Sequence, residues 1–378
     1  MKYYIIAGEA SGDLHASNLM KAIKKKDAYA EFRFWGGDLM QKQGGEMVKH
    51  YRNMAFMGFV EVITNIFTII KNLKFCKKDL SAFNPDVLIL VDYPGFNLRI
   101  AEFAHKNNLK TVYYISPQVW AWKQERVKKI KKIVDKMLVI LPFEKDFYKK
   151  FGMEVHFVGH PLLDALQHEE YLTEKDFRKK NNLPDKPIVA LLPGSRKQEV
   201  KKMLSVMLQA TPHFKEFHFI VCGVESLEAD YYEILSDYKK EKKYEQNISV
   251  VINQSRQVLH HAQAALVTSG TATLETALIG TPQVVCYKGG RVSYEIAKRV
   301  IKVNYISLVN LIMDKPVVKE LIQDELTVEN LKVELYKLLN DKEYRNLILA
   351  DYHLLKEKLG NSGASERAAE IIIDYIKS

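Results

Sequence analysis

The sequence predicts an α/β protein of two domains, each built on a doubly wound parallel sheet. Strand-like apolar segments alternate with amphipathic helix-like segments along most of the chain. The strand-like segments are apolar throughout, which is typical of parallel sheets covered by helices on both faces. The alternation pauses after residue 159 and begins again near residue 188, so we expect two Rossmann-like units.

The first half of the chain contains six expected strands and the helices between them. The strands are 3–7, 32–36, 87–92, 111–116, 137–141 and 155–159. The helices are about 13–25, 60–80, from 96, 123–135 and 144–150. A polar stretch with a proline follows, and we place the hinge near 160–166.

The second half repeats the pattern and then becomes helical. Its expected strands are 188–194, 217–223, 250–252, 265–270 and 283–288, with a helix from about 197. Residues 328–378 form a helical, strongly polar end. We expect domains at 1–162 and 163–361.

Composition limits the classes of function. The chain has 378 residues, of which 47% are hydrophobic, and a net charge of +10. This charge fits an anionic partner such as nucleic acid, a phosphorylated substrate or an anionic membrane, although solubility alone is a sufficient explanation. Three distant cysteines form no metal-ligand spacing and no disulfide framework, so we expect a reducing cytoplasm. The N-terminus runs directly into a strand-like segment, and we expect no signal peptide.

The first loop, IIAGEASGDLHAS (5–17), lacks the lysine of a P-loop and the third glycine of a dinucleotide site. Its carboxylates would repel a phosphate. In parallel sheets, ligands bind beyond the carboxyl ends of strands, where LVDYPGFN (90–97) places Asp92. A partly desolvated Asp92 would act as a general base, or it caps the turn. His15 and His160 are rival bases, although His160 fits better as a stabiliser of the hinge turn.

Two loops of the second half predict anion sites. In LLPGSRKQEV (191–200), Ser195 is a reasonable N-cap, and Arg196 offers a donor fork for a diphosphate unless it is simply solvated. In VTSGTATLETALIGTPQVVCYK (267–288), Ser269 to Thr271 open a helix whose first turn would bind phosphate. Glu275, one turn inside, would accept both ribose hydroxyls or serve the helix dipole.

Two further stretches fit a lipid or its membrane. MAFMGFVEVITNIFTIIKNLKF (54–75) is apolar, is interrupted by polar residues and is followed by lysines. It is too short to span a bilayer, and it fits an interfacial helix or a core helix about equally well. SPQVWAWKQERVKKIKKI (116–133) pairs two tryptophans with a basic helix, which suits nucleic acid or a phosphate-bearing lipid.

Together these segments resemble lipid-A-disaccharide synthase, a family of inverting glycosyltransferases of the GT-B fold. The matching segments run in family order: AGEASGD (7–13), MGFVEV (57–62), VDYPGFN (91–97), YYISPQVWAWKQERVKKI (113–130), LPFEKDFY (141–148), FVGHPLLD (157–164), LLPGSRKQEV (191–200), SGTATLE (269–275) and SLVNLIMDKPVVKELIQ (307–323). The PGSR and SGTATLE segments also occur in other UDP-sugar enzymes, whereas ISPQVWAW is far more specific.

The resemblance implies two facing domains around a central cleft, with the acceptor on the first and the nucleotide on the second. The last helix, about 362–377, would cross back to the first domain. Asp92 would be the catalytic base and Arg196 would stabilise the leaving diphosphate. Gly95 stands where some relatives carry an acid, which leaves Asp92 as the carboxylate of that turn.

The remaining expected site residues fall into three groups. Donor-site residues are Gly194, Ser195, Arg196, Ser269, Gly270, Thr271, Glu275, Asn310, Glu320 and Gln323. Acceptor-side residues are Gly8, Glu9, Ser11, Gly12, Asp13, His15 and Glu61, with Glu9 and Asp13 bonding sugar hydroxyls or ordering the loop. Membrane or acyl contacts are Met57, Phe59, Val60, Phe67, Lys71 and Lys74.

The resemblance also implies the reaction. UDP-2,3-diacylglucosamine would donate its sugar to the 6-hydroxyl of 2,3-diacylglucosamine 1-phosphate (lipid X), with no cofactor and no metal. The protein would lie on the anionic cytoplasmic face of the inner membrane and would bind no nucleic acid. Whether it forms a homo-oligomer is left open by the resemblance. The alternatives are an enzyme like UDP-N-acetylglucosamine 2-epimerase, which shares the fold, and a basic RNA- or membrane-binding module without catalysis.

Overall fold

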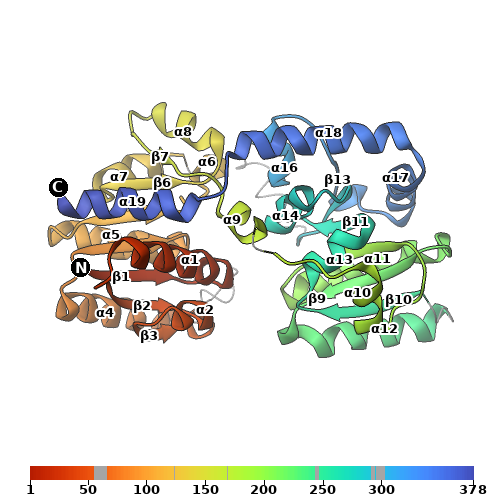
Figure 1. The fold of residues 1–378 in the computed structure, drawn as a ribbon, viewed down its shortest axis with the longest axis horizontal. Helices are drawn as coiled ribbons and strands as arrows, with labels where there is room; N and C mark the ends of the chain where they lie inside the picture. The colour runs from red at the N-terminus through yellow and green to blue at the C-terminus, as the bar shows by residue number, and fades with distance from the viewer. Residues whose placement is uncertain (55–65, 123, 168, 243–246, 291–293, 295–302) are drawn as a thin grey trace. The chain divides into compact units, whose positions relative to one another are not determined.

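The computed structural model describes residues 1–378 except 55–65, 123, 168, 243–246, 291–293 and 295–302. The chain forms two compact units: unit 1 comprises residues 1–167 and 359–378, and unit 2 comprises residues 168–358 (Figure 1). Each unit is a parallel sheet covered by helices, so the predicted pair of parallel α/β domains is confirmed.

The sheet of unit 1 has the order β3-β2-β1-β4-β5-β6-β7. Its strands are β1 (Lys2–Ala7), β2 (Glu31–Gly36), β3 (Glu46–His50), β4 (Val87–Val91), β5 (Thr111–Tyr114), β6 (Lys136–Val139) and β7 (His156–Phe157). Its helices are α1 (Ala10–Lys26), α2 (Asp38–Lys42), α4 (Ile66–Phe83), α5 (Pro94–Lys106), α6 (Val119–Trp122), α7 (Arg126–Ile133), α8 (Pro142–Lys149), α9 (Pro161–Gln167) and α19 (Ala364–Lys377).

The sheet of unit 2 has the order β10-β9-β8-β11-β12-β13. Its strands are β8 (Ile188–Leu192), β9 (His218–Gly223), β10 (Ile248–Ile252), β11 (Ala262–Thr268), β12 (Gln283–Tyr287) and β13 (Lys319–Ile322). Its helices are α10 (Glu174–Lys180), α11 (Lys197–Ala210), α12 (Glu228–Lys242), α13 (Ser255–His261), α14 (Thr271–Ile279), α16 (Leu308–Met313), α17 (Val328–Asn340) and α18 (Lys342–Leu359).

Two edge strands were not expected from the sequence. β3 carries the sequence EMVKH and β13 carries KELI, and each pairs with only one neighbour in its sheet. An edge strand buries less of its surface, so it lacks the continuous apolar run that marks the central strands. β1 and β4, by contrast, are buried almost end to end.

The C-terminal helix α19 belongs to unit 1, where it packs against α1 and α9. Figure 1 shows it in blue beside the red α1. The Asp164 carboxylate accepts hydrogen bonds from the backbone N–H groups of Gly363 at 2.5 Å and Ser365 at 3.0 Å. The Arg367 side chain donates from Nε to the Val158 carbonyl at 2.8 Å. These contacts cap the start of α19 and join it to α9 and to the segment that precedes α9.

Candidate active site

Each sheet reverses its strand order at one point, and several of the expected site residues lie in the loops at these two points. In unit 1 the reversal lies between β1 and β4, with Ala7 opposite Val91. The chain leaves β1 through Gly8 and Glu9 and leaves β4 through Asp92. A crevice at the carboxyl edge of such a pair is the usual ligand position in open α/β sheets.

The turn after β4 is strained and firmly held. Asp92 and Tyr93 both have left-handed backbones, with φ of 45° and 49°. The Asp92 carbonyl accepts hydrogen bonds from the Tyr113 hydroxyl at 2.5 Å and from Asn97 Nδ2 at 2.7 Å. Left-handed non-glycine residues cost about 1 kcal/mol or more each and persist where their surroundings fix them. The strain presents Asp92 at the carboxyl edge of the sheet.

The surroundings of the Asp92 carboxyl group alter its protonation. The pKa of Asp92 is raised to about 7, mainly because the carboxyl group is buried and secondly because the Glu9 carboxylate lies nearby. A base with a pKa near the working pH combines a large ionised fraction with sufficient basicity. The rival His160 is buried, and burial together with neighbouring His15 lowers its pKa to about 3. His160 Nδ1 accepts the Leu162 N–H at 3.2 Å, which fits the expected stabilisation of this turn.

Gly8 is required by the close approach of an aromatic ring. A Cβ atom at Gly8 would lie 2.3 Å from the ring of Tyr93. That ring stacks on Phe96, and its hydroxyl donates to the Met54 carbonyl at 2.9 Å. The first loop and the Asp92 turn therefore pack directly against each other.

Asp13 orders its loop, which was one of the two roles considered for it. The buried carboxylate accepts backbone N–H bonds from Gly37 at 2.7 Å, Leu39 at 3.1 Å and Met40 at 3.1 Å. These bonds satisfy the start of α2. Gly12 lies within α1, where a Cβ atom would approach the Ala7 Cβ to 3.3 Å. Ser11 is exposed and His15 is buried on the same helix.

Another buried carboxyl group, that of Glu144, lies at the ends of β5 and β6. Glu144 accepts the Ser116 hydroxyl at 2.5 Å and the Leu141 N–H at 2.9 Å. Burial raises the pKa of Glu144 to about 7. Ile115, which immediately precedes Ser116, has a left-handed backbone with φ of 65°. Glu144 thus fixes the turn that leads into SPQVWAW, and the sequence assigned it no role.

In unit 2 the reversal lies between β8 and β11, with Leu192 opposite Val267. Gly194 is left-handed, with φ of 111°, and a Cβ there would meet Glu199 Oε2 at 2.8 Å. The expected N-cap, Ser195, is wrong: Arg196 occupies the N-cap position of α11 and its side chain forms no cap bond. The longer side chain instead pairs with Glu199 at 2.9 Å and is 53% exposed, within reach of an anion.

The loop after β11 begins a helix and is tied to the end of β13. Gly270 precedes α14, whose first residue is Thr271, so the first-turn N–H groups lie at the carboxyl edge. The Ser269 hydroxyl donates to the Ile306 carbonyl at 3.0 Å. The next residue, Ser307, donates its N–H to Glu320 Oε1 at 2.9 Å.

Three expected donor-site residues have distinct surroundings. Asn310 is buried, and its amide bonds the Val318 backbone from both ends and also Glu320 at 2.9 Å. Asn310 and Glu320 are therefore committed to holding the 306–307 backbone. Gln323 is 8% exposed and left-handed, with φ of 53°, and its Nε2 has no hydrogen-bond partner among the described residues. Of the three, Gln323 keeps an amide available to a ligand.

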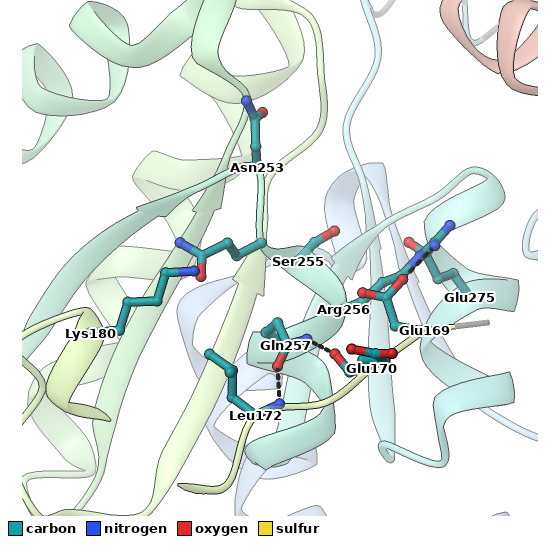
Figure 2. A pocket seen from close by; sticks show the side chains of 10 residues that line it. Glu169, Glu170, Leu172, Lys180, Asn253, Ser255, Arg256, Gln257 and Glu275 are labelled. Atoms are coloured by element: carbon teal, nitrogen blue, oxygen red, sulfur yellow. Dashed lines mark hydrogen bonds and ion pairs between the residues drawn. The ribbon is translucent and has the colours of Figure 1, made fainter. Parts of the chain in front are cut away.

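Glu275 lines a pocket of about 510 Å³ within unit 2 (Figure 2). The pocket lies at the start of α13 and beside α14. It is lined by Glu169, Glu170, Leu172, Lys180, Asn253, Gln254, Ser255, Arg256, Gln257 and Glu275. Figure 2 shows Arg256 between Glu169 and Glu275, and the sequence did not indicate this contact. A polar pocket of this size is adequate for a nucleoside.

Helix α4 combines a buried face with exposed apolar side chains. Cys76 and Leu80 are buried against unit 1, whereas Phe67 is 83% exposed. Lys71 and Lys74 are exposed on the same helix. The expected contacts Met57, Phe59 and Val60, and the acceptor-side Glu61, lie outside the described residues. The described part of the stretch thus has features of both a core helix and an interfacial one.

Two general findings complete the description. Among the helices built from described residues, none combines the length and the apolarity needed to cross a bilayer. In the part of the chain that the structure describes, no three His, Cys, Asp or Glu side chains gather closely enough to hold a metal ion.

Comparison with protein-family models shows which family the chain belongs to. The family model described as lipid-A-disaccharide synthetase matches residues 3–372. The chain belongs to this family. The family membership and the GT-B fold predicted from the sequence are confirmed, and the chain is a glycosyltransferase of lipid A biosynthesis.

Curated relatives match along the whole chain. The lipid-A-disaccharide synthase of Syntrophus aciditrophicus is 40% identical over 376 residues, which cover 99% of this chain and 97% of the relative. The lipid-A-disaccharide synthase of Coxiella burnetii (strain CbuG_Q212) is 36% identical over 379 residues, with coverage of 99% and 98%.

Solved structures share the fold at low identity. UDP-GlcNAc 2-epimerase from Neisseria meningitidis, bound to UDP-GlcNAc, has a TM-score of 0.68 at 12% identity and covers 99% of this chain and 100% of its own. The calicheamicin glycosyltransferase CalG4 has a TM-score of 0.63 at 15% identity, with coverage of 99% and 98%. The epimerase alternative therefore reflects only the shared fold.

Proposed function

We propose that the protein transfers 2,3-diacylglucosamine from UDP-2,3-diacylglucosamine to the 6-hydroxyl of lipid X. The products are the β-1,6-linked disaccharide 1-phosphate and UDP. The observation that carries this proposal is Asp92, a carboxyl group with a pKa of about 7 at the strand reversal of unit 1. The family relatives carry the name of this activity.

In the proposed reaction the Asp92 carboxylate takes the proton of the acceptor 6-hydroxyl. The acceptor oxygen then bonds to the anomeric carbon of the donor from the side opposite UDP, which inverts the configuration. The bond from the anomeric carbon to the diphosphate oxygen breaks, and its electron pair leaves with UDP. Each atom and charge is accounted for without a further reactant.

Unit 2 would hold the nucleotide. The pyrophosphate would lie at the first turn of α14, at Ser269, Gly270 and Thr271, where N–H groups point outward. Arg196, freed from Glu199, would neutralise the charge that develops on the leaving group. Solved structures of the same fold contain UDP or UDP-GlcNAc, which supports this assignment.

The nucleoside would occupy the pocket beside Glu275, whose carboxylate would accept the ribose hydroxyls. Gln323 would add an amide donor at the end of β13. Asn310 and Glu320 would not touch the nucleotide. They would hold the 306–307 backbone, to which the Ser269 hydroxyl is hydrogen-bonded.

Unit 1 would hold the acceptor and meet the membrane. Gly8, Glu9, Gly12 and the rest of the first loop would line the acceptor side of the strand reversal. The exposed Phe67 with Lys71 and Lys74 would rest on the anionic cytoplasmic face of the inner membrane, where both lipid substrates are found.

The test is turnover of purified protein with both lipids, with each omitted in turn, followed by mass spectrometry and UDP measurement. The proposal expects a disaccharide 1-phosphate and one UDP per disaccharide only when both are present. UDP release without acceptor, or conversion of UDP-GlcNAc alone to its 2-epimer, would contradict it.

A further inference from the structure

We infer that Arg256 is a positioning residue that holds Glu275 in the orientation that binds ribose. The inference rests on the proposed role of Glu275 in the donor site. Arg256 is the second residue of α13, directly after the turn that follows β10. It acts on the substrate only through Glu275.

The guanidinium of Arg256 bridges two carboxylates. Its Nε lies 2.8 Å from Glu275 Oε1, and its Nη1 lies 2.8 Å from Glu169 Oε2. The three side chains are 23%, 17% and 25% exposed, in the order Arg256, Glu275, Glu169. Partly buried ion pairs of this kind have a more fixed geometry than fully exposed surface pairs. Figure 2 shows the three side chains converging at one wall of the pocket.

The far carboxylate is itself anchored. Glu169 begins a segment, residues 169–172, that lies along α13. Gln257 Nε2 donates to the Glu170 carbonyl at 2.7 Å, and Gln257 Oε1 accepts the Leu172 N–H at 3.0 Å. The Tyr171 ring stacks on His260 with centroids 4.0 Å apart. One edge of the planar guanidinium is therefore fixed before the other meets Glu275.

This arrangement has a consequence for ribose binding. A Glu side chain on a helix samples several rotamers, and fixing it on binding a ligand costs affinity. Arg256 fixes one oxygen of Glu275 in advance, so less side-chain freedom is lost when the other oxygen accepts a hydrogen bond from a hydroxyl. Loss of Arg256 would also leave two carboxylates, Glu169 and Glu275, without the cation that bridges them. Arg256 thus prepares Glu275 as a hydroxyl acceptor.

A purely structural role predicts a different result, and a nucleotide pair separates the two. UDP and 2′-deoxy-UDP differ only in one hydroxyl that Glu275 would bind. We would measure both dissociation constants by calorimetry for wild type, Arg256→Met, Arg256→Lys, Glu169→Gln and Glu275→Gln. Lys179→Met is the matched control, since it removes an exposed cation of α10 that is not among the described residues lining the pocket.

Wild type should prefer UDP over 2′-deoxy-UDP by about tenfold or more, as expected for one hydrogen bond to a charged group. Arg256→Met and Glu275→Gln should each reduce this preference to about twofold, and the double variant should lose no more. Arg256→Lys and Glu169→Gln should lie between, and Lys179→Met should match wild type. These intermediate variants carry the test if Arg256→Met does not fold.

An unchanged preference in all Arg256 variants, or equal weakening of both nucleotides, would overturn the inference. Equal binding of both nucleotides by wild type would also overturn it, by removing Glu275 from the ribose. Neither outcome alters the disaccharide assay, whereas a wild type that binds no UDP contradicts the proposed function itself.

Discussion

Glu9→Gln should shift the pH dependence of catalysis through Asp92. The pKa of Asp92 rises from 3.8 to about 7, first through burial and second through the Glu9 carboxylate. This rise corresponds to about 4 kcal/mol against ionisation. Because Glu9 is the smaller cause, its removal should return less than half of the rise. We expect the pKa of Asp92 to fall by about one unit.

The sign of the effect follows from the role of the base. Asp92 must be ionised to accept a proton, so kcat/KM of wild type should decrease as the pH falls below about 7. In Glu9→Gln this acid limb should lie at lower pH. At pH 6 the ionised fraction would rise about fivefold for a one-unit shift, relative to each variant's own plateau.

The assay is initial-rate formation of UDP between pH 4.5 and 9 at low concentrations of both lipids. Normalising to the plateau separates the pH shift from any loss of acceptor binding. Glu31→Gln is the matched control, because Glu31 is an exposed acid at the start of β2 and makes the same change in net charge. An acid limb that stays in place in Glu9→Gln, or one that lies near pH 4 in wild type, would refute this reasoning.

Three further substitutions have defined outcomes. Gly8→Ala forces the Tyr93 ring to move, so it should lower the free energy of unfolding by about 1–3 kcal/mol and slow the turnover of lipid X, while the affinity for UDP stays the same. A variant that unfolds at the same denaturant concentration as wild type and turns over lipid X at the same rate would contradict this. Arg196→Ala should lower kcat/KM for the donor about 10- to 100-fold with little change in Tm, and steady-state kinetics checks it. Phe67→Glu should weaken binding to anionic vesicles about tenfold without loss of stability, and unchanged flotation would return Phe67 to a role without membrane contact.

The central strands could be predicted because burial on both faces leaves a continuous apolar run. VLILV of β4 and IVALL of β8 show it plainly, and the loops that follow them contain Asp92 and Arg196. The edge strands β3 and β13 lacked this signal, because half-buried positions accept polar residues. The strand order of each sheet has the single reversal that is typical of doubly wound α/β folds.

The site residues could be named more easily than their partners. Residue types at strand ends indicated Asp92, Ser269 and Glu275 as sites of chemistry. No spacing rule connects Arg256 to Glu275, since that contact depends on how α13 and α14 pack. The left-handed turn at Asp92 and Tyr93 is equally hidden in the sequence, because aspartate tolerates this conformation but a bulky tyrosine rarely adopts it.

The most direct test of Asp92 as the catalytic base is the rate of sugar transfer by the Asp92→Asn variant. The measurement is a single turnover at pH 8 with both lipids saturating, accompanied by the dissociation constant of UDP. We predict a loss of about 10²- to 10⁴-fold in rate with UDP affinity unchanged, because the proposed base lies on unit 1 and the proposed nucleotide site on unit 2. A rate within a few fold of wild type would show that another group takes the proton.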